Sequence, residues 1–224
     1  MHSIRQLASV ATLSTTLIAG NVQAAPVSWV DWTAGQPGSS GSASGVLSIA
    51  GQAVHVGFSG ELKFIQTDGG VNYWNPASPY TSTRVDNAPP AADILAFIYA
   101  AERTFTFSAP VQDLFLAVVS MNSNSYVFDR DFEIVSFGAG YWGTGTLVRT
   151  DLGDGRYALS GSGEPHGVIR FTGAISTFTL TSTTAEDWHG VTVGTYGIAP
   201  VPEPAGWALM LAGLALTGAL ARRR

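Results

Sequence analysis

The sequence predicts an all-β fold, and two observations support this prediction. From residue 26 onward, short segments rich in Val, Ile, Phe, Tyr and Thr alternate with clusters of Gly, Asn, Asp, Pro and Ser, as in strands joined by turns. No stretch of this region sustains the 3.6-residue apolar repeat of an amphipathic helix for long. Many short strands favour a two-sheet β-sandwich, jelly-roll-like, over alternating strands and helices.

The expected strands recur along the whole middle of the chain. Several alternate in polarity, as in residues 104–107, where two phenylalanines share one face, so one face is expected in the core and the other in water. The strands are expected at residues 27–32, 45–49, 53–58, 61–66, 103–107, 114–120, 126–134, 145–150, 156–161, 167–172, 175–181 and 191–197.

Three segments between these strands carry different expectations. Residues 39–44 are rich in Gly and Ser, which predicts a flexible connection. Residues 68–90 are polar and interrupted by prolines, so they predict a long surface loop. The apolar residues 91–101 follow two prolines and predict a helix.

Charge and cysteine content exclude several functions. The 175 residues from Pro26 to Pro200 suit one compact domain, and they contain seven basic and fifteen acidic residues, a formal net charge of −8. Such an acidic domain offers no basic face to a phosphate backbone, so nucleic acid is not an expected partner. The sequence contains no cysteine, which excludes disulfides, thiolate nucleophiles and cysteine-ligated metals.

Residues 1–24 predict a signal peptide, with an apolar helix that signal peptidase removes. Arg5 precedes the apolar stretch 7–20, and small side chains follow at the peptidase positions. Cleavage is expected between Ala24 and Ala25. The ectodomain would then comprise residues 25–200.

The C-terminal segment, residues 201–224, predicts a transmembrane helix. Residues 205–221 carry no charge, and the last three residues are Arg222, Arg223 and Arg224. Seventeen helical residues are about 26 Å long, close to the hydrocarbon core of about 30 Å. Because arginines next to a membrane span stay in the cytoplasm, the acidic domain is expected outside.

This C-terminal segment resembles the PEP-CTERM sorting signal of Gram-negative bacteria. The resemblance rests on Pro202, Glu203 and Pro204, on a short hydrophobic helix that contains Trp207, and on the terminal arginines. It implies recognition by exosortase, a membrane transpeptidase, with removal of the tail and transfer to the cell surface or extracellular matrix. Three body segments, residues 105–111, 159–171 and 186–194, are similar to segments of β-sandwich ectodomains that carry this tail, which implies a shared fold but no shared activity.

Metal-ligand patterns are present but incomplete. His166 and His189 each follow an acidic residue two positions earlier, Glu164 and Asp187, and two such loops together would offer imidazole and carboxylate ligands. The alternative, which we favour, is that both histidines mark tight turns with polar side chains outside. No cofactor is expected; a structural calcium ion stays open, with candidate ligands at a further turn, Asp151 and Asp154.

Catalytic signatures are missing from the sequence, so the ectodomain is not expected to be an enzyme. Aromatic residues in expected loops, Tyr73, Trp74 and Trp188, suggest stacking on sugar rings and hence polysaccharide binding. The alternative is a secreted carbohydrate-active hydrolase that uses two acids, Glu164 and Glu186, since glycoside hydrolysis needs a carboxyl pair at a fixed separation.

Overall fold

The computed structural model describes residues 25–200. The expected signal helix and C-terminal transmembrane helix lie outside the described residues. Within residues 25–200, no helix is long and apolar enough to cross a membrane.

The described residues form β-strands and one short 3-10 helix, so the all-β prediction is confirmed. The strands are β1 (Ser28–Trp29), β2 (Asp31–Gln36), β3 (Gly38–Ile49), β4 (Gln52–Leu62), β5 (Phe64–Gln66), β6 (Ile94–Phe97), β7 (Glu102–Val119), β8 (Ser125–Phe128), β9 (Glu133–Gly138), β10 (Gly145–Asp151), β11 (Tyr157–Gly163), β12 (His166–Ser182) and β13 (His189–Ile198), and the 3-10 helix η1 is Ser78–Tyr80.

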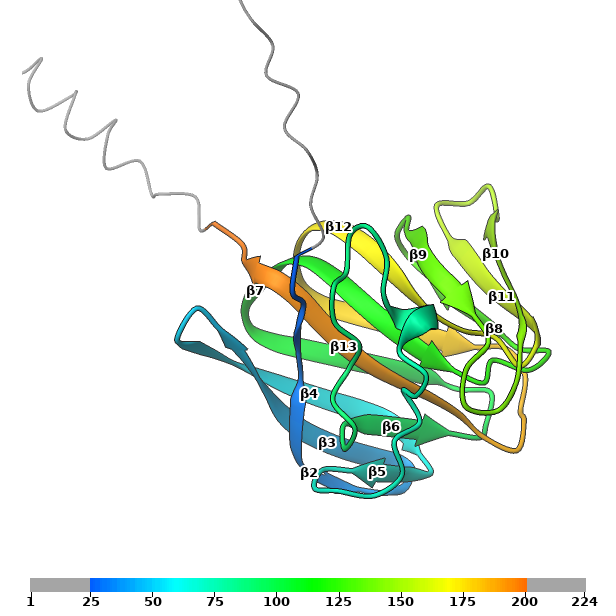
Figure 1. The fold of residues 1–224 in the computed structure, drawn as a ribbon, viewed down its shortest axis with the longest axis horizontal. Coiled ribbons are helices and arrows are strands. Elements are labelled where there is room, and N and C mark those ends of the chain that lie inside the picture. Colours follow the sequence, from blue (N-terminus) through cyan, green and yellow to red (C-terminus); the bar gives the residue numbers. More distant parts are fainter. Residues whose placement is uncertain (1–24, 201–224) are drawn as a thin grey trace, which may run out of the picture.

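Hydrogen bonds join the 13 strands into one sheet, and every strand pair is antiparallel. The strands β12, β7 and β13 lie side by side through its middle (Figure 1). The β2, β3 and β4 strands continue from the first half of β7. Because one hydrogen-bonded sheet contains all strands, the expected two-sheet, jelly-roll arrangement is not confirmed.

Two long strands set this architecture because they change partners along their length. The first part of β7 pairs with β4, whereas its second part pairs with β13. Its partner β12 has register shifts between Phe171 and Ala174 and between Ile175 and Thr177. Such bulges bend a strand and interrupt its alternating pattern. The sequence pattern therefore predicted two separate strands within β7 and two within β12.

The main core lies on the inner face of the sheet. Strand alternation places Phe58 of β4, Phe105 of β7 and Phe178 of β12 inside, each at most 3% exposed. The Phe58 and Phe105 rings lie 5.1 Å apart, and Phe105 and Phe178 lie 5.7 Å apart. Burying each such side chain contributes roughly 1.5–3 kcal/mol.

A buried ion pair crosses the strands next to this core. Arg103 of β7 is fully buried and is paired with Glu61 of β4. Its guanidinium also donates to the carbonyls of Tyr99 (2.7 Å) and Ala101 (2.9 Å) and to the hydroxyl of Ser182 (3.0 Å). Such satisfied hydrogen bonding is what makes a buried charge tolerable.

A second core covers the outer face of the central strands. Residues 114–119 of β7 are buried on both faces, because Trp74 and Tyr80, from the segment between β5 and β6, pack on the outer face. This segment was expected to be a surface loop. It contains η1 and little other regular structure, but its side chains pack on the outer face of the sheet.

Two local expectations were wrong. Residues 94–97 form β6 instead of a helix, because all four side chains are buried between the two cores and the strand pairs with β5 and β13. Residues 39–44 belong to β3 and are not a flexible connection. Glycine is needed there for close packing, since a Cβ at Gly41 would lie 2.7 Å from Leu62 Cβ.

Candidate functional site

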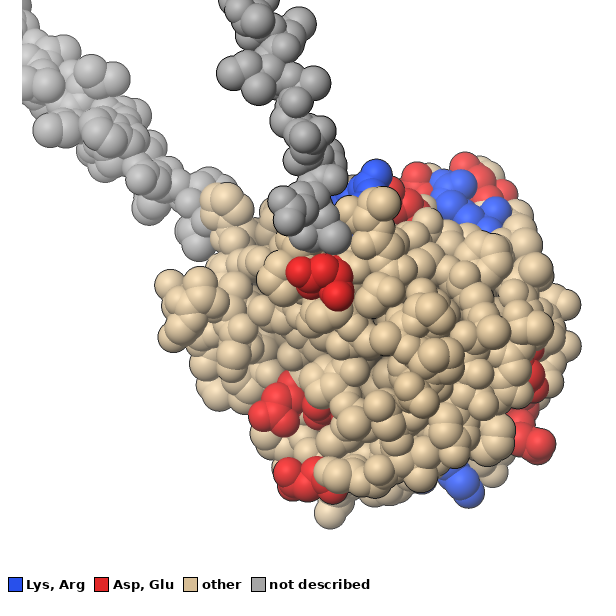
Figure 2. Space-filling model, in the orientation of Figure 1, with Lys and Arg blue, Asp and Glu red and all other residues tan. Residues whose placement is uncertain are grey.

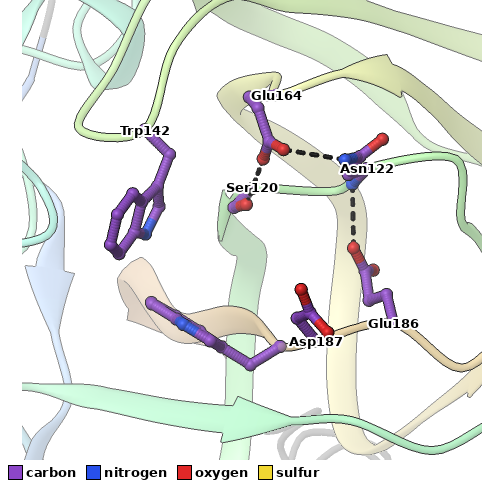
Figure 3. A pocket seen from close by; sticks show the side chains of 7 residues that line it. Ser120, Asn122, Trp142, Glu164, Glu186 and Asp187 are labelled. Atoms are coloured by element: carbon purple, nitrogen blue, oxygen red, sulfur yellow. Dashed lines mark hydrogen bonds between the residues drawn. The ribbon is translucent and has the colours of Figure 1, made fainter.

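Four connections meet at one end of the domain and enclose a pocket. They join β7 to β8, β9 to β10, β11 to β12 and β12 to β13. The cavity has a volume of about 370 Å³, and it is lined by Ser120, Asn122, Trp142, Glu164, Glu186, Asp187 and Trp188. Figure 3 shows the carboxylates on one side and Trp142 facing them across the cavity.

One asparagine links the two glutamates. The Asn122 side-chain Nδ2 donates to Glu164 Oε1 over 2.8 Å, and its backbone N–H donates to Glu186 Oε2 over 3.0 Å (Figure 3). The hydroxyl of Ser120 donates to the other oxygen of Glu164. Asn122 therefore holds the Glu164 and Glu186 carboxyl groups near each other, because it donates a hydrogen bond to each.

The Glu186 carboxyl has an unusual acidity. Burial raises its pKa to about 7, and the nearby charges of Glu164 and Asp187 act in the same direction. Hydrogen bonds from the Asn124 side chain, at 2.8 Å, and from the Asn122 backbone oppose this shift. Near neutral pH, Glu186 therefore exists both as the acid and as the carboxylate.

Trp142 and Trp188 form the opposite wall of the pocket, and they belong to a group of five aromatic residues that we call the aromatic cluster. Its ring centroids lie 4.9 to 6.4 Å apart, mostly edge to face. The cluster consists of Phe64, Tyr73, Tyr141, Trp142 and Trp188. Trp142 is 50% exposed and Tyr141 is 43% exposed, so the cluster presents apolar surface to solvent beside the carboxylates.

His166 fixes the loop that carries Trp142. Its Nε2 accepts the backbone N–H of Trp142 at 3.3 Å, and its Nδ1 lies 2.7 Å from the Tyr80 hydroxyl. Burial lowers the pKa of His166 to about 4, so the ring is neutral. Because Nε2 accepts, we assign the proton to Nδ1, which donates to Tyr80.

His189 supports the acidic side in the same way. Both Asn124 side-chain hydrogens have acceptors, one at Glu186 Oε1 and one at His189 Nε2 (3.5 Å). The Nδ1 atom of His189 contacts the Tyr126 hydroxyl. Burial, together with the charge of Arg103, lowers the pKa of His189 to about 3, so this histidine is also a neutral support for the pocket.

Backbone geometry at two positions brings the connections together. A Cβ at Gly140 would lie 2.2 Å from His166 Cγ, so only glycine allows the Trp142 loop to pack on the imidazole. Ser120 has a φ of 56°, a left-handed conformation that is rare for a non-glycine residue and often found at functional sites.

The structure brings together only part of the residues that the sequence singled out. Glu164, Asp187 and Trp188 line the pocket, and Tyr73 belongs to the aromatic cluster. Trp74 is 1% exposed and packs on the sheet, so the expectation that it stacks on a sugar was wrong.

The expected metal ligands do not form one group. His166 and His189 are fully buried in strands, so the expectation of outward-facing turn residues was wrong. Asp151 and Asp154 lie at the β10–β11 turn, where they accept hydrogen bonds from Gly153 and Arg156. Among residues 25–200, no three His, Cys, Asp or Glu side chains are grouped as metal ligands.

Sequence reasoning did not single out Ser120, Asn122 and Trp142. The polar run from Ser120 to Ser125 and the glycines around Tyr141 and Trp142 were visible signals of two loops. No local sequence pattern predicted that these loops meet, because Ser120 and Glu164 are 44 residues apart and Asn122 and Glu186 are 64 residues apart.

The fold and the site define an all-β domain with an acidic, aromatic-lined pocket formed by its connections. The end of the chain, residues 200–224, matches the PEP-CTERM protein-sorting motif, which confirms the resemblance noted in the sequence. The chain therefore carries the signal of a protein that is exported, processed by exosortase and sorted to the cell surface. No curated protein and no solved structure matches the chain.

Proposed function

We propose that this exosortase substrate is a non-enzymatic surface or matrix protein that binds extracellular polysaccharide in the pocket of its ectodomain. The observation that carries the proposal is the wall of half-exposed Trp142 and partly buried Trp188 in one open cavity. The same cavity is lined by Glu164, Glu186 and Asn122. The proposal includes removal of the signal peptide after Ala24 and a C-terminal membrane helix before processing.

The chemistry of the pocket suits a sugar. Apolar faces of pyranose rings pack on indole and phenol rings, and carboxylate and amide groups bind the hydroxyls at the ring edge. The indole of Trp142 is half exposed and is not part of either hydrophobic core. Exposed aromatic surface beside polar groups is typical of binding sites. This combination favours carbohydrate over a purely apolar ligand.

The position of the pocket suits a surface receptor. Strand β13 begins at His189, beside the pocket, and ends at Ile198, shortly before the sorting motif (Figure 1). Its ten residues span about 30 Å at the usual rise of about 3.3 Å. A tail at the far end of β13 would leave the pocket facing away from the membrane.

A glycan array with the full chain in detergent tests this proposal. We expect retention on at least one polysaccharide class, and we expect Trp142→Ala to weaken it at least about tenfold, as for central aromatic contacts. The control is Phe137→Ala, since Phe137 is 46% exposed but is not part of the pocket lining. Absence of retention on every glycan, or unchanged retention by Trp142→Ala, would reject the proposal.

The linked carboxyl groups favour glycoside hydrolysis as a second candidate function. Protonated Glu186 would donate its proton to the glycosidic oxygen while the Glu164 carboxylate takes a proton from the attacking water, so that cleavage gives two hydroxyl ends. Release of reducing ends from the retained glycan, lost in both Glu186→Gln and Glu164→Gln, would support hydrolysis. Retention without release would favour binding alone.

A further inference from the structure

We infer that the pocket takes a cationic glycan, one whose sugar units carry free amino groups; this inference rests on the proposed function and specifies its ligand. The ammonium group would lie against the carboxylates of Glu164 and Asp187, beside the carboxyl group of Glu186, and the sugar ring would lie against Trp142 and Trp188. Three features of the pocket support this assignment.

The first feature is uncompensated negative charge. Three of the seven lining residues are acidic, and the lining contains no lysine or arginine. All six arginines of residues 25–200 form ion pairs, and none of these pairs includes Glu164, Glu186 or Asp187. On the face shown in Figure 2, basic side chains are few and lie near the rim.

Among residues 25–200, the only ion-pair contact of the pocket acids is with a histidine that carries no charge. His189 Nδ1 lies 4.0 Å from Glu186 Oε1, but burial holds the pKa of His189 near 3. The pocket therefore lacks a positive charge of its own, and a ligand is the natural source of one.

The second feature is free hydrogen-bonding capacity. Each oxygen of Glu164 accepts one hydrogen bond, which leaves one lone pair on each. The Asp187 carboxylate is exposed, and within the described residues it accepts no hydrogen bond from a side chain or a backbone N–H. An ammonium group has three donors and no acceptor, so it matches a site of acceptors.

The third feature is the aromatic wall. Indole and phenol faces attract cations as well as apolar sugar faces. Trp142 and Trp188 lie 6.0 Å apart and both line the cavity with the carboxylates. A uronic-acid polymer would be repelled here, and a neutral glycan would use the wall but gain little from the carboxylates.

Calorimetric titration of the full chain in detergent tests the inference with two probes of equal length. These are a fully deacetylated chitosan trisaccharide and the fully N-acetylated trisaccharide, at a mildly acidic pH and physiological salt. We expect the deacetylated probe to bind at least about tenfold tighter. Glu164→Gln and Asp187→Asn should each remove most of that preference, because each should weaken binding of the deacetylated probe far more than binding of the acetylated probe.

The control variant is Asp129→Asn, which removes an exposed carboxylate outside the pocket lining. If Asp129→Asn weakens binding as much as Asp187→Asn does, attraction is to the overall charge and the inference is wrong. Equal binding of both probes also overturns the inference but leaves polysaccharide binding intact. Because Asp187 is exposed, its substitution tests the inference even if Glu164→Gln does not fold.

Discussion

At the scale of single residues, Glu186 links the pocket to the stability of the domain. Its carboxyl lies between Glu164, Asp187 and the neutral ring of His189, and it accepts hydrogen bonds from Asn122 and Asn124. Burial outweighs these bonds and raises its pKa from 4.5 to about 7. The folded protein therefore holds this proton at a pH where the unfolded chain has lost it.

The sign of the pH effect follows from this difference. Between pH 4.5 and 7, the folded state binds more protons at Glu186 than the unfolded state, so the contribution of Glu186 to stability falls as pH rises. The fall levels off above pH 7, once the carboxyl group is ionised in the folded state as well. We expect Glu186→Gln to remove this loss of stability. Between pH 5 and pH 8, the free energy of unfolding should therefore fall more in the natural protein than in the variant. Urea unfolding at both pH values measures the difference, and a gap that does not change with pH would contradict it.

At the scale of elements, the β9–β10 connection depends on the contact between Gly140 and His166. We expect Gly140→Ala to displace Trp142 and to weaken glycan binding by about tenfold, because the new Cβ would lie 2.2 Å from His166 Cγ. The matched control is Gly197→Ala, where no atom beyond the adjacent residues lies within 4 Å of the new Cβ. Equal affinity of the two variants on the glycan array would show that this contact does not position Trp142.

The strands were the predictable part of the fold. Alternation in residues 104–107 and the apolar run of residues 114–119 were visible in the sequence, and both belong to β7. The short strand β6 was not predictable, because burial of Ile94 and Leu95 on opposite faces removes the alternation that distinguishes a half-buried strand from a helix.

The pocket was predictable only in pieces. Glu164, Glu186 and Trp188 were identified from residue type, but their meeting depends on which strands are neighbours in the sheet. Both histidines were predicted to lie in exposed turns, because a glycine follows each of them. In the structure, Gly167 and Gly190 lie in the strands β12 and β13. Local patterns do not encode such long-range pairing.

At the scale of the whole molecule, the sorting motif at residues 200–224 ends in three arginines. We expect replacement of Arg222, Arg223 and Arg224 by serine to impair retention and processing, because the positive charges fix the cytoplasmic end of the expected helix. Fractionated cells probed for the uncut and cut forms measure this effect. Unchanged tail removal in the triple variant would contradict the expected topology.

The central claim is that the pocket binds glycan, and the indole N–H signals of the full chain test it most directly. In an NMR titration with a partially deacetylated chitin oligosaccharide, we expect the signals of Trp142 and Trp188 to shift, while those of Trp32 and Trp74, which are at most 1% exposed, stay in place. Shifts that leave Trp142 and Trp188 unchanged, or no shifts at all, would contradict the claim.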